Sequence, residues 1–238
     1  MKRPNSTEPP TGKDMSNCDA IIFDMDGVLL DSEPLHLQAW QMLLADFAIN
    51  YGFEEHKQFL GRKDLFMAGQ LCLRFNLPVS AAQLTCQKER CYLQLVEKHA
   101  VPRAGLLRLL DQLVSAGMPC ALASSATAAT IASTLSVLAL NSYFQSVSSG
   151  DDVENGKPAP DVFLLAAGNL KVQPERCVVI EDTRNGILAA RSAGMICVAV
   201  PCASTVHEDH SLAHLQLQSL EELSLERLRQ LALPLGCP

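Results

Sequence analysis

Two aspartates directly follow a short apolar run near the start of the chain, and this combination limits the folds that can accommodate it. The run AIIF at residues 20–23 has the length and aliphatic content of a buried parallel strand. Asp24 and Asp26 come next, and because residues i and i+2 of an extended chain share a face, both carboxylates are expected to point the same way. Gly27 permits a sharp turn just afterwards. Such a pair is costly at the end of a buried strand unless a cation or a proton joins it, so the stretch indicates either a polar site or an ordinary acidic turn.

Strands and helices alternate in the second part of the chain. Apolar runs at 119–123, 177–181 and 195–200 have the length of buried strands. Gly117 and Gly194 each stand where a helix would end, just before one of these strands. The alternation predicts an α/β fold, a Rossmann-like parallel sheet with helices on both faces, whose ligands bind at the carboxyl ends of the strands.

Residues 33–99 differ from the rest because no apolar run in them resembles a buried strand. Apolar side chains recur there at helical spacing, and Ser80 fits a helix N-cap. We therefore expect an all-helical insertion of roughly three to five helices between the first strand and the rest of the sheet. The predicted organisation is a disordered tail over 1–17, a core formed by 18–32 and 100–238, and the insertion over 33–99, with an amphipathic surface helix near the end at 220–231.

Charge and composition exclude several classes of protein. The formal net charge of −7 disfavours nucleic acid as a partner, since a phosphate backbone requires a basic face. No apolar run reaches the roughly 18 residues needed to span a bilayer, and no secretory signal is recognisable. The nine cysteines include no C-x-x-C pair, which favours reduced thiols over disulfides or zinc ligands. We therefore expect a cytoplasmic monomer or weak dimer that binds neither nucleic acid nor membranes.

Four segments rich in polar residues are expected to meet at the carboxyl edge of the sheet. Ser124 and Ser125 follow a buried strand and are predicted to open a helix, where hydroxyl and free N–H groups can bind an anion. Lys157 stands between a glycine and a proline, and Glu181 and Asp182 end another apolar strand. The segments are DMDGVLLDSE at 24–33, ASSA at 123–126, GKPAPDVF at 156–163 and VIEDTRNGI at 179–187.

In this order, the four segments resemble the motifs of the haloacid dehalogenase-like hydrolases, and the helical insertion resembles the cap of the subgroup of β-phosphoglucomutase-like phosphatases. The resemblance covers almost the whole chain after the tail. It implies a magnesium-dependent phosphatase acting on a small phosphorylated metabolite, a sugar phosphate or a nucleoside monophosphate. By similarity, Asp24 is the nucleophile that forms an aspartyl-phosphate and Asp26 is the general acid and base. Ser124, Ser125 and Lys157 would hold the phosphoryl group.

The same resemblance implies a Mg²⁺ site built from the Asp24 carboxylate, the Asp26 backbone carbonyl and Asp182. Glu181 would lie beside the metal or act through water. Electrostatics supports a need for cations, because a phosphate ester is anionic and each like-charge pair at ~4 Å costs about 1 kcal/mol in water and about 4 kcal/mol at an effective dielectric constant of 20. Lys157 and a hard divalent cation would supply the compensating charge.

The cap is expected to choose the substrate. His36 matches a position that the β-phosphoglucomutases use, although a partly buried helix histidine is an equal alternative. Arg62 and Lys63 form a basic turn with Gly61 that could present a cation to the substrate or simply be solvated. The mutases place an arginine three residues after the matching glycine, where this chain has Asp64. Since a mutase must hold a second phosphate with its cap, a phosphatase is favoured.

Alternative interpretations remain for several features. A β-phosphoglucomutase-like phosphosugar mutase and a catalytically silent ligand-sensing protein are the alternative functions, although no carboxylate or lysine of the motifs is missing here. The serines, Lys157 and the acidic pair could also be plain helix caps or loop residues. The histidines His207, His210 and His214 do not form an H-E-x-x-H motif and are expected to be structural.

Overall fold

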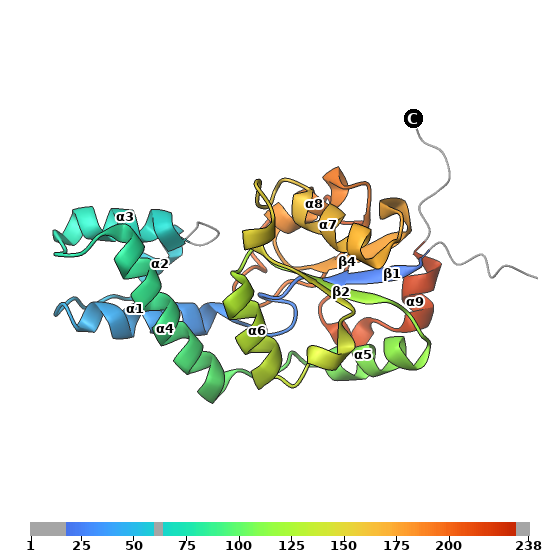
Figure 1. The fold of residues 1–238 in the computed structure, drawn as a ribbon, viewed down its shortest axis with the longest axis horizontal. Coiled ribbons are helices and arrows are strands. Elements are labelled where there is room, and N and C mark those ends of the chain that lie inside the picture. The colour runs from blue at the N-terminus through green and yellow to red at the C-terminus, as the bar shows by residue number, and fades with distance from the viewer. Residues whose placement is uncertain (1–17, 60–63, 232–238) are drawn as a thin grey trace, which may run out of the picture.

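A six-stranded parallel sheet forms the centre of the molecule in the computed structural model, which describes residues 18–59 and 64–231 (Figure 1). The strand order is β3-β2-β1-β4-β5-β6, and each neighbouring pair is parallel. The α/β fold expected from the sequence is therefore confirmed. The strands are β1 (Ala20–Phe23), β2 (Cys120–Ala123), β3 (Ser146–Ser148), β4 (Cys177–Glu181), β5 (Ile196–Ala199) and β6 (Leu215–Gln216).

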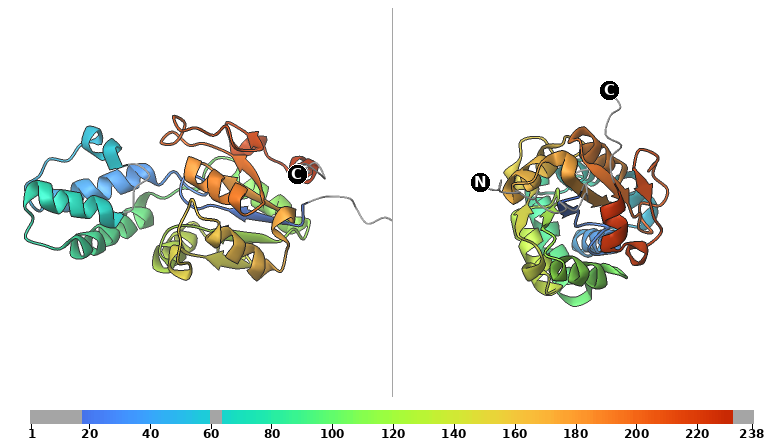
Figure 2. Two further views of the ribbon diagram at one scale, coloured as in Figure 1. Left: turned by 90° about the horizontal axis from the view of Figure 1, so that it is seen from above. Right: turned by 90° about the vertical axis from the view of Figure 1, so that its right-hand side faces the viewer.

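Helices cover both faces of the sheet. One face packs against α5 (Leu106–Ser115), α6 (Ala128–Val137) and α9 (Leu225–Gln230), and the other packs against α7 (Asp161–Leu170) and α8 (Arg184–Ser192). Figures 1 and 2 show the sheet between these two layers. Short 3₁₀ helices lie in the connections: η1 (Lys57–Phe59), η2 (Asn141–Tyr143), η3 (Gly150–Asp152), η4 (Pro174–Arg176) and η5 (Leu220–Glu222).

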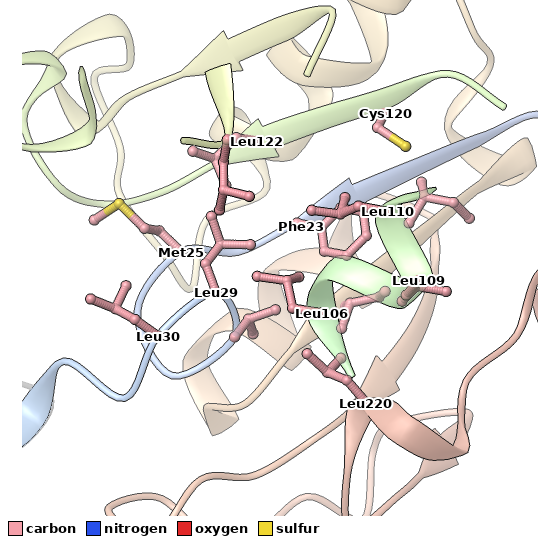
Figure 3. Close-up of a cluster of buried hydrophobic side chains, with 14 of the residues drawn as sticks. Phe23, Met25, Leu29, Leu30, Leu106, Leu109, Leu110, Cys120, Leu122 and Leu220 are labelled. Atoms are coloured by element: carbon pink, nitrogen blue, oxygen red, sulfur yellow. The ribbon is translucent and has the colours of Figure 1, made fainter. Parts of the chain in front are cut away.

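Strand β1 is buried on both sides, and its side chains alternate between the two hydrophobic layers. Ile21 and Phe23 face the cluster that includes α5, whereas Ala20 and Ile22 face the cluster that includes α7 and α8. Figure 3 shows Phe23 in the first cluster beside side chains of α5. This two-sided burial explains why the strand reads as a continuous apolar run that stops abruptly at Asp24.

Helices also account for the described secondary structure between residues 33 and 99, and they lie beyond one end of the sheet (Figures 1 and 2). They have a hydrophobic cluster of their own, which includes Trp40, Leu71 and Leu84. The proposed division into a core and a cap at 33–99 stays a prediction, and the predicted tail lies outside the described residues. The helices are α1 (Glu33–Ala45), α2 (Phe53–His56), α3 (Asp64–Phe75) and α4 (Ala81–His99).

Two strands and one helix boundary differ from the sequence-based expectation. Strands β3 and β6 contain only three and two residues, too few to produce a recognisable apolar run. The single helix predicted over 220–231 consists of η5 and α9 instead, because Ser224 accepts a hydrogen bond from the Arg227 backbone and starts a new helix there. The expected helix ends at Gly117 and Gly194 are confirmed by φ angles of 65° and 74°.

No helix in the described part of the chain is both long and apolar enough to cross a membrane. The cysteines of that part are all free, eight in number. Four of them, Cys18, Cys120, Cys177 and Cys197, pack as small apolar groups in the buried clusters on the sheet.

Removing the N-cap of α4 should destabilise the protein. The Ser80 hydroxyl accepts a hydrogen bond from the Gln83 backbone N–H, and the Gln83 side chain accepts one from the Ser80 backbone. We expect Ser80→Ala to lower the free energy of unfolding by about 1 kcal/mol, and Ser80→Asp, which keeps the acceptor, to leave it nearly unchanged. Thermal denaturation of both variants tests this, and an alanine variant as stable as the wild type would contradict it.

Candidate active site

Three buried carboxylates lie together where two neighbouring strands end. Asp24 directly follows β1, Glu181 is the last residue of β4, and Asp182 comes next. The parallel register pairs Phe23 with Ile180, so the carboxyl ends of the two strands lie side by side. One oxygen atom of each carboxylate lies within 4.8 Å of one from the other two. The sequence-based expectation that these two strand ends meet is confirmed.

Lys157 inserts its ammonium group between two of these carboxylates. Its Nζ atom donates hydrogen bonds to Asp24 Oδ1 at 2.5 Å and to Glu181 Oε1 at 2.8 Å, and it lies 3.3 Å from the Ala123 carbonyl oxygen. The side chain is only 7% exposed, so a solvated loop lysine is ruled out. Burial opposes the charged form, but Asp24 and Glu181 together raise the pKa of Lys157 above its usual value.

One lysine does not balance three carboxylates. Burial, the largest influence, together with the charges of Glu181 and Asp26, raises the pKa of Asp24 to about 7 although Lys157 acts in the opposite direction. Burial, together with the charges of Glu181 and Asp24, also raises the pKa of Asp182 well above its ordinary value. Without another cation the cluster therefore favours proton uptake, whereas a divalent cation would allow all three groups to ionise.

Glu181 and Asp182 are adjacent in the sequence but have different surroundings. Glu181 Oε2 accepts hydrogen bonds from the Asp182 and Thr183 backbone N–H groups at 2.7 and 2.8 Å, and from the Thr183 hydroxyl at 3.0 Å. With Lys157 on its other oxygen, this carboxylate is fully hydrogen-bonded. Asp182 Oδ1, by contrast, is buried and has no hydrogen-bond partner among the described residues. An unsatisfied buried oxygen beside Asp24 fits a hard metal ion such as Mg²⁺.

Two glycines make room for these carboxylates. A Cβ atom on Gly27, which has a φ angle of +75°, would lie 1.8 Å from Asp182 Oδ2. A Cβ atom on Gly186, near the start of α8, would lie 1.6 Å from Glu181 Oε1. Both glycines are therefore required by close approach to an acidic side chain, beyond any need of the local turn.

Asp26 lies beside the cluster and is more accessible than its members. Its side chain is 37% exposed, and its Oδ1 atom is 3.8 Å from His36 Nε2. Burial raises the pKa of Asp26, but the contacts with His36 and Ser32 lower it by more, so that the pKa lies below its usual value. The structure thus brings His36, on α1, to the edge of the predicted site.

Lys88 is buried and contacts His36 on the ring nitrogen that does not face Asp26. The sequence analysis did not single out this lysine. Lys88, on α4, donates to His36 Nδ1 at 2.6 Å and to Asp64 Oδ2 at 2.6 Å. Because an ammonium group only donates, Nδ1 of His36 must be an acceptor, and its Nε2 carries the proton that faces Asp26. The His36 ring also stacks on Tyr92 at a centroid distance of 4.1 Å. The sequence signal was the position of Lys88 on the apolar stripe between Leu84 and Tyr92.

The predicted helix start at Ser124 and Ser125 is wrong. Helix α6 begins at Ala128, and Thr127 is its N-cap. The Ser124 side chain instead accepts from the Ala126 backbone N–H at 3.1 Å, which forms a local turn before the helix. Ser124 is buried at the end of β2, beside β1, whereas Ser125 is exposed.

A further carboxylate joins the α4 helix to α6. Glu89 Oε1 accepts hydrogen bonds at 2.8 Å from both the Thr127 and the Thr130 hydroxyl groups. Nearby, the Ala128 backbone N–H donates to Asp151 Oδ2 at 2.8 Å. Carboxylates of the protein itself therefore accept the hydrogen bonds of donors in and next to the first turn of α6, where the sequence analysis expected an anion site.

The remaining predicted residues fall into two groups. His210 is buried and donates from Nε2 to the Asp182 backbone carbonyl at 2.7 Å, and His214 accepts from the Cys197 backbone N–H, whereas His207 is exposed. In the described part of the chain, none of these histidines belongs to a cluster able to hold a metal. Arg62 and Lys63 lie outside the described residues.

Comparisons with known proteins agree with this geometry. A family model described as haloacid dehalogenase-like hydrolase matches residues 18–194. A probable pseudouridine-5'-phosphatase from Drosophila melanogaster is 36% identical over 212 residues, which span 87% of this chain and 91% of that protein. The fructose-1-phosphate phosphatase YqaB from Escherichia coli is 34% identical over 182 residues, 76% of this chain and 95% of that protein. A crystal structure of mutant CbbY from Rhodobacter sphaeroides with xylulose-(1,5)bisphosphate matches with a TM-score of 0.81 and 28% identity, covering 89% of this chain and 99% of that chain.

The space for Glu181 can be tested with two glycines that both lie inside helices. A Cβ atom on Gly186 would overlap the Glu181 carboxylate, whereas a Cβ atom on Gly168, in α7, meets nothing within 4 Å. We expect Gly186→Ala to destabilise the protein by about 1–3 kcal/mol through overpacking. Gly168→Ala should be neutral or stabilise it by up to about 1 kcal/mol through helix propensity. Equal unfolding free energies of the two variants in denaturant titrations would refute the close approach.

Proposed function

The chain belongs to the haloacid dehalogenase-like hydrolases, and from this membership and the geometry of its site we propose a magnesium-dependent phosphatase for a small phosphorylated metabolite. The observation that carries the proposal is the buried cluster of Asp24, Glu181 and Asp182 with Lys157 inserted into it. Two of the relatives are named as phosphatases, one for pseudouridine 5'-phosphate and one for fructose 1-phosphate. A nucleoside monophosphate or a sugar phosphate is therefore the proposed substrate class.

In the proposed reaction Asp24 and Asp26 divide the chemistry between them. An Asp24 oxygen attacks phosphorus, the bond to the leaving oxygen breaks, and Asp26 gives that oxygen a proton, which it must take up before this step because His36 and Ser32 favour its carboxylate form. In the second half Asp26 takes a proton from water, the water oxygen attacks phosphorus, and the Asp24 carboxylate is released with inorganic phosphate. The greater exposure of Asp26, 37% for its side chain, supports this role because the group must reach both substrate and water.

Lys157 and the metal would balance the negative charge. The proposed metal ligands are the carboxylates of Asp24 and Asp182 and the backbone carbonyl of Asp26, and the free oxygen of Asp182 supports this assignment. Bound Mg²⁺ would neutralise charge on the transferring phosphoryl group and allow an anionic substrate to approach the carboxylates. Glu181, whose oxygens are already hydrogen-bonded, would act indirectly by holding Lys157 and the start of α8.

Ser124 and Lys157 are the proposed contacts of the phosphoryl group in the core. Ser124 lies at the end of β2, beside the strand that leads to Asp24. The exposed position of Ser125 supports a role only at the rim of the site. Cytoplasmic location and a monomeric or weakly dimeric state remain proposals.

The pairing of Lys88 favours a phosphatase over a mutase. A mutase needs cations from its cap to bind the second phosphate of its bisphosphate. Lys88, on α4, is a buried cation, but its Nζ atom already lies 2.6 Å from Asp64 Oδ2. Because Lys88 donates hydrogen bonds to His36 and Asp64, and Asp64 compensates its charge, Lys88 is poorly suited to bind a second phosphate. His36 is the proposed substrate-facing residue of the cap, while Arg62 and Lys63 stay predictions.

A phosphate-release panel with an Asp24 variant tests the proposed function. We expect the wild type to release phosphate from at least one compound among pseudouridine 5'-phosphate, other nucleoside monophosphates, fructose 1-phosphate and other sugar phosphates. Asp24→Asn should abolish the release because an amide is not a nucleophile for phosphorus, whereas Asp111→Asn, an exposed carboxylate on α5, should not affect it. Turnover that survives in Asp24→Asn would contradict the covalent mechanism. Interconversion of glucose phosphates with little phosphate release would favour the mutase.

Removal of the metal gives a separate test. Treatment with EDTA should abolish phosphate release, and Mg²⁺ should restore it, because the carboxylates otherwise repel the substrate or bind protons. In the same samples, Mg²⁺ without substrate should raise the melting temperature of the EDTA-treated protein, since the cation relieves repulsion within the folded cluster. Full activity after EDTA treatment and dialysis would contradict the proposal.

A further inference from the structure

We propose that the loop after β5, residues 201–210, sets the orientation of the Asp182 carboxylate for the metal, with Thr205 and His210 as its positioning residues. The inference rests on the proposed function, since it assumes that Asp182 is a metal ligand. It assigns a role to a segment outside the motifs that identify the family. The loop contacts Asp182 at both its carboxylate and its backbone carbonyl.

The side-chain contact comes from Thr205. Its Oγ1 atom lies 3.0 Å from Asp182 Oδ2 and 3.0 Å from the Cys202 backbone nitrogen. A hydroxyl group has one hydrogen to donate, and the Cys202 N–H can only donate, so the threonine hydrogen is available to the Asp182 carboxylate, a stronger acceptor than the Cys202 sulfur at 3.5 Å. The Cys202 thiol lies 3.6 Å from the same carboxylate oxygen and adds a weak second donor.

These contacts select one oxygen of Asp182 and leave the other for the metal. Oδ2 is held by the loop, whereas Oδ1 is buried without a hydrogen-bond partner among the described residues. Gly27, in the turn after β1, also packs against this carboxylate so closely that even a Cβ atom would overlap Oδ2. The carboxylate is therefore fixed between the loop and the turn after β1, and Thr205 determines which oxygen remains free.

The backbone contact comes from His210. The last ladder bond at this end of β4 joins the Val200 N–H to the Glu181 carbonyl at 2.7 Å, so the Asp182 carbonyl lies just beyond the sheet. His210, only 4% exposed, donates to that carbonyl from Nε2 at 2.7 Å. This bond holds the main chain of Asp182, which connects the end of β4 to Thr183, the N-cap of α8.

Arg103 ties the loop to the other side of the site. Its guanidinium group donates to the carbonyls of Val200 at 2.8 Å and Pro201 at 3.1 Å, where the loop begins, and also to the carbonyl of Gly27. Gly27 belongs to the turn that carries Asp24 and Asp26. The loop and the two aspartates are therefore anchored to one planar side chain, which supports a common function in shaping the metal site.

The test compares Mg²⁺ binding by Thr205 and His210 variants with matched controls. Thr205→Val removes the hydroxyl with almost no change of shape, and Thr205→Ser keeps it. His210→Leu removes the donor, His210→Gln can supply an N–H near the same place, and His207→Leu changes an exposed histidine of the same loop. Isothermal titration calorimetry without substrate gives the Mg²⁺ dissociation constant, and the melting temperature in EDTA reports the stability of each metal-free variant.

We expect Thr205→Val and His210→Leu to weaken Mg²⁺ binding at least about tenfold, the usual effect of removing a group that orients a metal ligand. Thr205→Ser, His210→Gln and His207→Leu should bind Mg²⁺ nearly as the wild type does. The KM for substrate at saturating Mg²⁺ should change little in all five variants, because the loop acts on the metal site. Unchanged Mg²⁺ affinity in both loss variants would overturn the inference.

Two other outcomes separate this inference from its premise. A wild type that binds no Mg²⁺ and releases no phosphate overturns the proposed function and the inference with it. A wild type that binds Mg²⁺, with affinity falling in Thr205→Ser as far as in Thr205→Val, overturns the inference alone, because the hydroxyl would then not be the cause. The inference would also be overturned if the His207→Leu control lost as much metal-free stability and as much Mg²⁺ affinity as the loss variants Thr205→Val and His210→Leu.

Discussion

The charge imbalance at the ends of β1 and β4 is the constraint on which the rest of the site depends. Three carboxylates are buried there with one ammonium group, and each strand end is fixed by the parallel ladder of the sheet. The fold cannot relax this repulsion by moving one group away, because Asp24 and Glu181 directly continue fully buried strands. Repulsion of this kind is relieved only by protons or by a cation, and it adds to burial, the larger cause, in raising the pKa of Asp24 to about 7. The proposed metal dependence therefore rests on the architecture of the sheet.

The two adjacent acidic residues of the fourth motif differ in their hydrogen bonds. Glu181 uses its oxygens to hold Lys157 and the first turn of α8, while Asp182 keeps one oxygen unpaired. The helix start explains the difference, since the backbone N–H groups of residues 182 and 183 point back at Glu181 and lie close enough to bond it. The hydrogen bonds that satisfy Glu181 thus leave its neighbour Asp182 with an oxygen that has no partner among the described residues, as the proposed metal site requires.

The sequence predicts the parts of the site that depend on local pattern and on parallel strand order. Asp24 and Asp182 were expected together in this way, because the carboxyl ends of parallel strands share one edge, whereas Lys157 was expected there from the resemblance of its segment to a family motif. The partners of His36 were not, since Lys88 lies 52 residues away along the chain and meets it only through the packing of two helices. The boundary of α6 was missed for a different reason. Ser124 forms its own turn and Thr127 is the helix cap, so three hydroxyl residues within four positions, Ser124, Ser125 and Thr127, left the helix start ambiguous.

Helices α1 and α4 connect the helical region to the sheet region, because each contributes side chains to both hydrophobic clusters. The first half of α1 contributes Leu35 and Ala39 to the cluster on the sheet, and its second half contributes Trp40 and Leu44 to the helical cluster. Helix α4 crosses the same boundary, from Leu84 in the helical cluster to Leu95 and Val96 in the cluster on the sheet. His36 and Lys88 lie near these crossing points, where the apolar layers give way to polar contacts. The position of the two helices therefore fixes the imidazole that faces Asp26, and a change in how the helical region sits on the sheet would move that imidazole relative to Asp26.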